Sequence, residues 1–214
     1  DAAGAASASS DVLEDMIRVL GEDHPHTLTT RGNLARWQGE AGDAAGAASA
    51  YAELLTARIR VLGEDHPDTL ITRGNLAGWR GKAGDPAGAA SAYAELLTAR
   101  IRVLGEDHHD TLITRGNLAG WRGKAGDPAG AASAYADLLG DMIRVLGDDH
   151  PHTLATRINL AGWQGLTGDA ASAASAYADL LGDMIRVLGE GHPHTLTTRK
   201  HLAYWRGKSL ESGN

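Results

Sequence analysis

Five tryptophans recur at an interval of 42 residues, and this spacing constrains the fold more than any other feature of the sequence. They stand at Trp37, Trp79, Trp121, Trp163 and Trp205. The neighbouring words recur with them, so that Ser49–Trp79 returns as Ser91–Trp121 with a single change, Pro67 to His109. A period of this length without insertions predicts a stacked array of helical hairpins and not a globule built around one catalytic cleft.

The register of the repeat divides the chain into six segments. Asp1 aligns with Asp43, so the sequence begins half-way through a unit, and the pattern can be followed to Lys208. We expect one continuous α-solenoid over residues 1–214, and the absence of an initial methionine suggests that the natural start is missing. Its segments are a half repeat with only the second helix of a unit (1–21), four full repeats (22–63, 64–105, 106–147 and 148–189), and a half repeat with the first helix and a short tail (190–214).

Each full unit carries the signals of two helices and of no strand. In the unit 64–105 the first helix, helix A, opens at Pro67, because proline at the first helical position loses no hydrogen bond, and it fades at Gly84. The second, helix B, opens after the capping residue Asp85 and stops at Gly105. Apolar residues of helix B are spaced by three and four, which gives it one stripe to bury. The predicted fold class is all-α.

Composition excludes several kinds of partner. A net charge of −7 provides no basic surface for nucleic acid, whose affinity comes mostly from neutralised phosphates. No apolar run approaches the roughly 20 residues that cross a bilayer. Cysteine is absent, which rules out disulfides and thiolate chemistry and is typical of a cytoplasmic protein. We therefore expect a cytoplasmic protein with no nucleic-acid and no membrane partner.

Catalytic, metal and cofactor sites find little support in the sequence. Histidines recur just before each helix A, at His24, His66, His108, His150 and His192. A metal site needs three or four converging ligands, and no unit supplies a third, so we interpret these histidines as helix caps. The tripeptide Gly207-Lys208-Ser209 lacks the rest of a phosphate-binding loop. The acidic residues stand in repeated turns that single out no general acid. We expect no enzyme.

The words of the repeat resemble the tetratricopeptide superfamily, in the 42-residue form of kinesin light chains and of many actinobacterial proteins. The resemblance rests on LGEDHPDTL at Leu62–Leu70, NLA at Asn75–Ala77, and Gly84, Ala89 and Tyr93. It implies a right-handed superhelical solenoid of antiparallel helix pairs that acts as a non-catalytic protein-binding or peptide-binding scaffold through the concave face of its A helices. Two alternatives stay open: a purely structural or self-associating array without a specific ligand, and the sensor arm of a larger signalling ATPase.

A ladder of arginines and asparagines on helix A is the candidate peptide site. Its members are Arg31, Asn33, Arg73, Asn75, Arg115, Asn117, Arg157 and Asn159. The resemblance implies that such residues hold extended acidic peptides, and a guanidinium binds carboxylates through two hydrogen bonds. The other reading is an internal bridge, for instance from Arg73 to Glu53 or Glu95. The acids at the equivalent position of the other units are Asp11, Asp137 and Asp179.

Glycines mark one face of helix A. Gly74, Gly78 and Gly81 are spaced by four and three residues, although each glycine inside a helix costs about 1 kcal/mol relative to alanine. Either the bare backbone lets successive A helices approach closely, or it leaves room for a peptide. We favour close approach, and we expect the tryptophans to pack between units.

The two ends predict self-association. Ser9 and Ser10 replace Tyr51 and Ala52 of the later copy, which indicates a partial polar cap. Near-identical units offer near-identical interfaces, so we expect weak end-to-end association or domain swapping.

Overall fold

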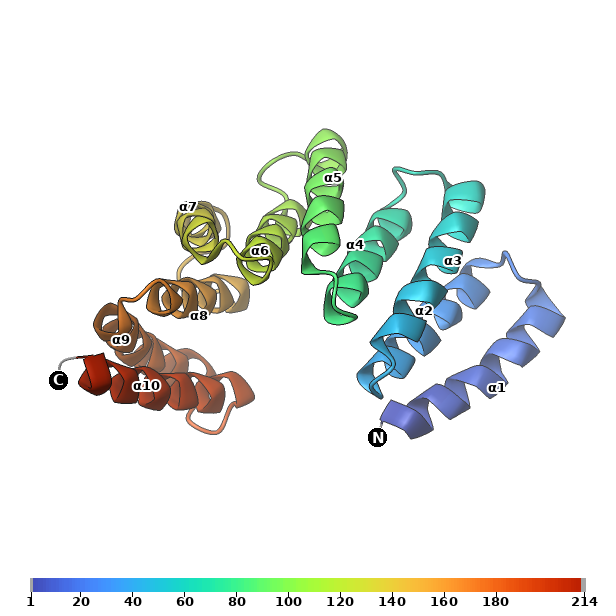
Figure 1. Ribbon diagram of the computed structural model, residues 1–214. Coiled ribbons are helices and arrows are strands. Elements are labelled where there is room, and N and C mark those ends of the chain that lie inside the picture. The colour runs from blue at the N-terminus through green and yellow to red at the C-terminus, as the bar shows by residue number, and fades with distance from the viewer. Residues whose placement is uncertain (1, 213–214) are drawn as a thin grey trace. The chain divides into compact units, whose positions relative to one another are not determined.

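The computed structural model describes residues 2–212, and these residues form ten α-helices and no strand (Figure 1). The helices are α1 (Ala2–Leu20), α2 (Pro25–Glu40), α3 (Ala44–Leu62), α4 (Pro67–Lys82), α5 (Pro86–Leu104), α6 (His109–Lys124), α7 (Pro128–Leu146), α8 (Pro151–Leu166), α9 (Ala170–Leu188) and α10 (Pro193–Ser212). Even-numbered helices are of the A type and odd-numbered helices of the B type. The predicted all-α fold class is confirmed.

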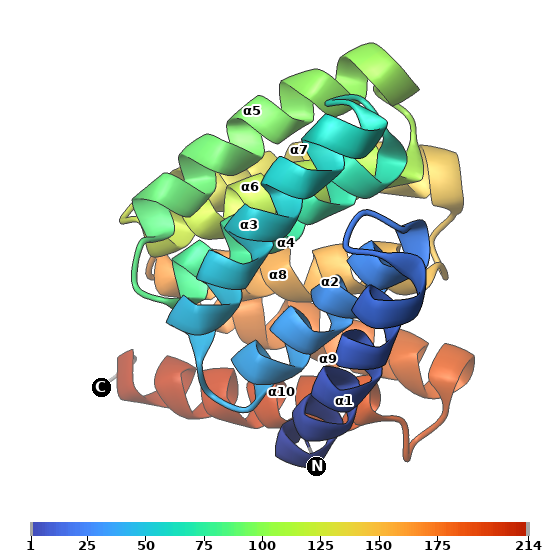
Figure 2. The ribbon, with the colours of Figure 1, turned by 90° about the vertical axis from the view of Figure 1, so that its right-hand side faces the viewer.

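The chain forms two compact units. The first spans residues 1–105 and holds α1–α5, and the second spans 106–214 and holds α6–α10. Within each unit, helices that follow one another in the sequence pack side by side (Figure 2). The predicted pairs of helices are therefore present in both units, while one continuous solenoid over 1–214 stays a prediction.

Local capping sets the helix boundaries. The Nδ1 atom of His66 accepts a hydrogen bond from the backbone N–H of Asp68 at 3.2 Å, and His24, His108, His150 and His192 cap the other A helices in the same way. Each B helix from α3 to α9 opens with an aspartate, as where the Asp85 carboxylate accepts from the N–H of Gly88 at 2.8 Å. The interpretation of the histidines as caps is confirmed.

One hydrogen bond recurs inside every full hairpin. The hydroxyl of Tyr93 in α5 donates to the backbone carbonyl of Gly74 in α4 at 2.8 Å. Tyr51, Tyr135 and Tyr177 donate to the carbonyls of Gly32, Gly116 and Ile158 at 2.7 to 2.8 Å. Burial raises the pKa of Tyr135 and of Tyr177 to about 12, so these hydroxyls remain donors over the whole physiological range.

Glycines of helix A admit bulky side chains from two directions. A Cβ atom at Gly74 would lie 3.4 Å from Leu96 in α5, and one at Gly78 would lie 3.2 Å from the Tyr93 hydroxyl. At the third glycine position, a Cβ atom at Gly39 would lie 2.5 Å from the ring of Trp79 in the next A helix. The third position therefore receives the tryptophan ring of the next A helix, as expected for tryptophans that pack between repeats, whereas the first two positions receive the hairpin's own helix B.

Candidate functional site

The arginines of the predicted ladder lie beside acids of the same chain. Their closest pairs are Arg31–Glu53 at 3.9 Å, Arg73–Glu64 at 3.5 Å, Arg115–Asp141 at 2.6 Å and Arg157–Asp183 at 2.8 Å. The internal-bridge reading is thus supported for all four side chains. The hydrogen bond from Arg115, followed by that from Arg144, holds the pKa of the Asp141 carboxyl below its usual range.

Three of the four arginines pair with acids other than the expected ones. Arg115 pairs with Asp141, which lies one helical turn beyond the expected Asp137 on the same face of α7. Arg157 likewise pairs with Asp183 and not with Asp179. Helices α3 and α5 have alanine at this position, Ala57 and Ala99, so Arg73 reaches Glu64 in the loop before α4 and neither Glu53 nor Glu95.

Helices α3 and α7 also differ at a second position, which is occupied by Arg58 in α3. Its side chain is 7% exposed, and its Nη1 atom donates to the Asp68 carbonyl and to the Thr72 hydroxyl, both at 2.8 Å. Desolvation lowers the pKa of this guanidinium. In α7 the equivalent residue is Met142, which is also buried. Arg58 therefore acts in the core of the first unit and is not available to a ligand.

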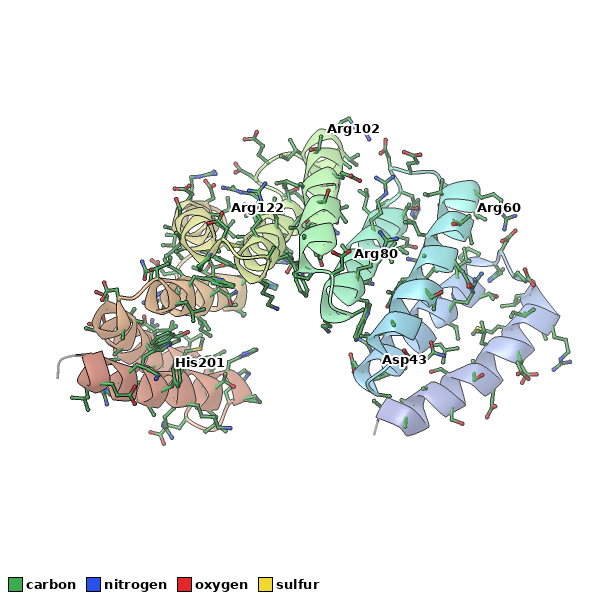
Figure 3. All side chains as sticks on the ribbon, viewed as in Figure 1. Asp43, Arg60, Arg80, Arg102, Arg122 and His201 are labelled. Carbon is green, nitrogen blue, oxygen red and sulfur yellow. The ribbon has the colours of Figure 1, made fainter. Side chains whose placement is uncertain are left out.

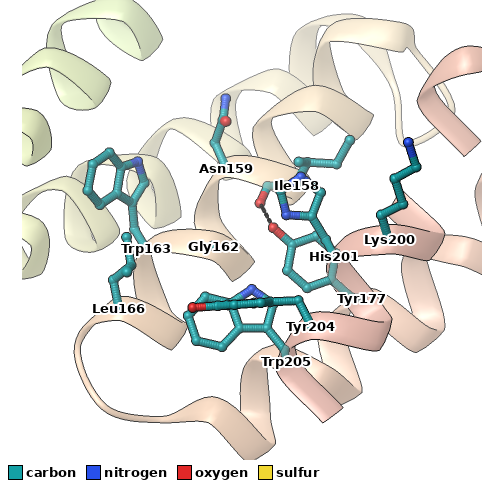
Figure 4. Close-up of a pocket in the computed structure, with 10 residues that line it drawn as sticks. All are labelled: Ile158, Asn159, Gly162, Trp163, Leu166, Tyr177, Lys200, His201, Tyr204 and Trp205. Carbon is teal, nitrogen blue, oxygen red and sulfur yellow. Dashed lines mark hydrogen bonds between the residues drawn. The ribbon is translucent and has the colours of Figure 1, made fainter. Parts of the chain in front are cut away.

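All four asparagines of the ladder are exposed, and two of them line cavities in the second unit. Asn159 borders a cavity of about 570 Å³ formed by α8, α9 and α10 (Figure 4). Its lining residues are Ile158, Asn159, Gly162, Trp163, Leu166, Tyr177, Lys200, His201, Tyr204 and Trp205. Asn117 borders a smaller cavity of about 220 Å³ between α6, α7 and α8.

Five of the ten residues that line the larger cavity carry an aromatic ring. Tyr204 meets Trp205 edge to face with ring centroids 4.9 Å apart, and His201 stacks on Tyr177 at 5.3 Å. The side chain of Tyr204 is 54% exposed although it is large and mostly apolar. Lys200 supplies a positive charge at the rim, which suits a ligand with both an apolar group and a carboxylate.

The two cavities share the lining residues Asn159 and Trp163, so they adjoin each other along the A helices of the second unit. We call this surface the α6–α10 groove. Towards α6 it is more polar and is bordered by Lys124, whose Nζ atom lies 4.3 Å from the ring centroid of Trp121. Such a groove offers an apolar cavity at one end and amide groups along its length.

Residues 27–68, 69–110 and 111–152 match the tetratricopeptide repeat family, and together they make up more than half of the chain. The chain belongs to the tetratricopeptide repeat family. The predicted resemblance is confirmed, including the 42-residue spacing. Tetratricopeptide repeats generally mediate protein–protein interactions, and kinesin-light-chain-like arrays of them are typically non-catalytic. No curated protein matches the sequence significantly.

Solved structures agree with this fold. BtubC (BKLC) from P. vanneervenii is 19% identical with a TM-score of 0.77, over 98% of this chain and 84% of that one. A kinesin-light-chain protein of P. anserina with nearly identical TPR-like repeats is 21% identical with a TM-score of 0.70, over 89% and 92% of the two chains. A single-substitution variant of such a P. anserina protein is 19% identical with a TM-score of 0.72, over 86% and 87%. At these identities the likeness shows the fold alone.

Departures from the tetratricopeptide repeat pattern locate the groove residues that our sequence analysis missed. Lys200, His201 and Tyr204 stand in α10 where the unit 64–105 has glycine, asparagine and glycine. Leu166 stands where that unit has Lys82. These changes all fall on the cavity lining, so the signal was present in the sequence as a local break in the repeat.

A second set of ion pairs lies outside the groove in this tetratricopeptide repeat protein. Arg102 in the last turn of α5 makes two hydrogen bonds with the Asp65 carboxylate, one of them at 2.7 Å. Arg60–Asp23, Arg144–Asp107 and Arg186–Asp149 repeat this arrangement, and Figure 3 labels Arg60 and Arg102 at the ends of their helices. Each pair joins the end of a helix B to the loop that precedes helix A of the same hairpin.

The described part of the chain contains neither a group of metal ligands nor a membrane-spanning helix. Among residues 2–212, no group of three histidine, aspartate or glutamate side chains is placed to hold a metal ion. No helix of that range is long and apolar enough to span a bilayer.

Proposed function

We propose that this chain is a non-catalytic scaffold that binds a protein or peptide partner in the α6–α10 groove. The observation that carries the proposal is the 570 Å³ cavity with the exposed side chains of Tyr204 and Leu166 on its lining. Large apolar side chains that stay exposed around a concave surface are typical of binding sites. The repeat family supports a protein as the partner.

The chemistry of the groove favours an extended acidic segment. An apolar side chain of the ligand fits among the aromatic rings, and a neighbouring carboxylate meets Lys200. The amides of Asn117 and Asn159 face the same groove and can bind the ligand backbone. A ligand role for the ladder arginines stays a prediction. The ion pair that each arginine makes with an acid of the same chain counts against it.

Binding of short peptides tests this function. Labelled peptides with one leucine or aromatic residue flanked by aspartates or glutamates are titrated with the chain, and lysine-flanked peptides serve as the charge-reversed set. Tyr204→Ala and Lys200→Ala should each weaken binding about tenfold or more, because the changes remove an aromatic and a charged anchor. Leu210→Ala is the matched control, since Leu210 is exposed on α10 and outside the groove. Equal binding of the two peptide sets would exclude an acidic ligand.

Self-association is a second function that one observation favours. Leu54, Leu96, Leu138 and Leu180 of the B helices are 1% exposed, whereas the equivalent Val12 in α1 is 48% exposed. On the A helices, Leu154 is fully buried and the equivalent Leu196 in α10 is 43% exposed. The bare faces of α1 and α10 are thus the two halves of the interface that every full hairpin buries. We infer weak end-to-end contact or domain swapping between copies.

Composition supports the rest of the proposal. The absence of cysteine supports a cytoplasmic location, and the charge of −7 argues against nucleic acid as a partner. A structural array or a sensor arm of a larger ATPase stays the alternative, and a groove ligand that depends on Tyr204 would count against a purely structural role.

A further inference from the structure

Three imidazoles meet where α6 and α8 begin. The ring centroids of His109 and His152 lie 4.7 Å apart, those of His109 and His150 lie 5.9 Å apart, and those of His150 and His152 lie 5.5 Å apart. His109 is the first residue of α6, and the other two belong to the start of α8. The cluster, here called the histidine trio, therefore bridges two successive hairpins of the second unit.

The trio exists because one residue departs from the repeat. The other four A helices begin with a proline, at Pro25, Pro67, Pro151 and Pro193. At the next junction of the same unit, Pro151 takes the place of His109, and it borders one small cavity together with His192 and His194. That junction has a stacked pair of imidazoles, 5.3 Å apart, and a proline as their neighbour. The two junctions thus differ by one imidazole.

The capping bond at the start of α8 requires a neutral ring at His150. His150 caps α8 through Nδ1, which accepts the N–H of His152 at 3.2 Å, and this atom can accept only when it carries no proton. A proton there would also place a positive charge at the positive end of the helix dipole. Two protonated rings at these separations repel each other. Partial desolvation, together with the charges of His109 and His150, holds the pKa of His152 below its usual range.

Two of the acids near the trio, Asp107 and Asp149, are bound by arginines. Asp107, two residues before His109, is bound by Arg144 through two hydrogen bonds, and Asp149, next to His150, is bound by Arg186 in the same way. The other titratable residues of the adjoining segments are Glu106, His108, Asp110 and Asp148. The groups that act on the charge of His152 are the other two members of the trio.

We propose that the histidine trio is an acid-responsive contact, which joins the starts of α6 and α8 when its rings are neutral and loosens when they take up protons. The inference is independent of any ligand in the α6–α10 groove. The unfolded chain binds protons near the ordinary histidine pKa of 6.5, above the lowered value of His152. The contact therefore stabilises the fold above that pH, and this stabilisation is lost as the pH falls through 6.5 towards the lowered pKa.

Reciprocal exchange of the two junctions tests the proposal on the unliganded chain. His109→Pro gives the first junction the residue of the second, and Pro151→His gives the second a third imidazole. Both residues already begin A helices in this chain, so both variants are compatible with the fold. The melting temperature is measured by circular dichroism at about pH 8 and about pH 5. A change in intrinsic helix stability from proline affects both conditions equally, so the difference between them isolates the titration.

We expect His109→Pro to lose less melting temperature on acidification than the wild type, and Pro151→His to lose more. Titration of the imidazole protons by NMR should show the pKa of His152 rising when His109 is removed. A wild-type pH dependence in either variant, or an unchanged titration of His152 in His109→Pro, would overturn the proposal.

Discussion

The ring of Trp163 lies directly over Gly123, where a Cβ atom would be only 2.5 Å from the indole Cη2 atom. This relationship joins α8 to α6, and Gly165 receives Trp205 of α10 in the same way. The tryptophan period noted in the sequence is therefore the contact by which one A helix seats on the previous one. Because Trp163 also lines both cavities of the α6–α10 groove, the contact fixes a wall of the proposed site.

Gly123→Ala should destabilise the second unit by about 1–3 kcal/mol, because the methyl group overlaps the Trp163 ring and forces it to move. Gly140→Ala is the matched control. Gly140 is an exposed glycine inside α7 with nothing near its Cβ position, so alanine there should stabilise by about 0.5–1 kcal/mol. Urea unfolding of the two variants measures the difference. A neutral Gly123→Ala would contradict the seating of Trp163.

Arg115→Ala should lower stability by less than about 1 kcal/mol, since its bridge to Asp141 is partly solvent-exposed. It should leave the affinity of a groove ligand unchanged if the arginine is only a bridge. Peptide titration and denaturant unfolding of the same variant separate the two roles. A loss of affinity without loss of stability would instead support the ligand role predicted for the arginine ladder.

Acid should weaken the ion pairs at the ends of the B helices. The hydrogen bonds from Arg144 lower the pKa of Asp107 below the ordinary value of 3.8, and the hydrogen bond from Arg115, followed by that from Arg144, lowers the pKa of Asp141. A carboxyl whose pKa is lowered by folding stabilises the native state above its unfolded value, and this contribution is lost as the pH falls through the lowered pKa. Arg144→Met should therefore flatten the loss of melting temperature below about pH 4. An unchanged acid profile would show that these pairs are energetically silent.

Leu196→Glu and Val12→Glu should each shift the chain towards the monomer in sedimentation velocity runs over a concentration series, because a buried carboxylate opposes the end-to-end contact. Leu210→Glu is the control, since Leu210 is 74% exposed at the far end of α10. A wild-type chain that sediments as a monomer at every concentration would contradict self-association.

How much of this molecule could be predicted depended on how local each interaction is. The starts of α4 and α5 were predicted correctly because His66 and Asp85 bind backbone groups within three residues. The partner of Arg73 was not, because it depends on whether helix B carries alanine or aspartate one turn away, a difference between units that the shared pattern concealed.

Cavity residues were missed for the opposite reason. The near-identity of the copies drew attention to the Arg and Asn positions that stay constant, whereas Lys200, His201 and Tyr204 line the cavity and are the positions that change. In a repeat protein, the positions that depart from the consensus are the better guide to a site. Asn117 and Asn159 were candidates through the resemblance to the tetratricopeptide family; both border cavities, and their role in binding stays a prediction.

The hydrogen bond from the tyrosine of helix B to a backbone carbonyl of helix A affects how the sequence of such an array can vary. Tyr93 and Tyr177 donate to backbone carbonyls, so the bond persists whether the accepting residue is Gly74 or Ile158. Ile158 nevertheless alters the cavity that it borders. A mutation at this position therefore changes the shape of the groove while the hairpin keeps its tyrosine hydrogen bond. Repeats that arose by duplication can thus gain new binding surfaces without losing the fold.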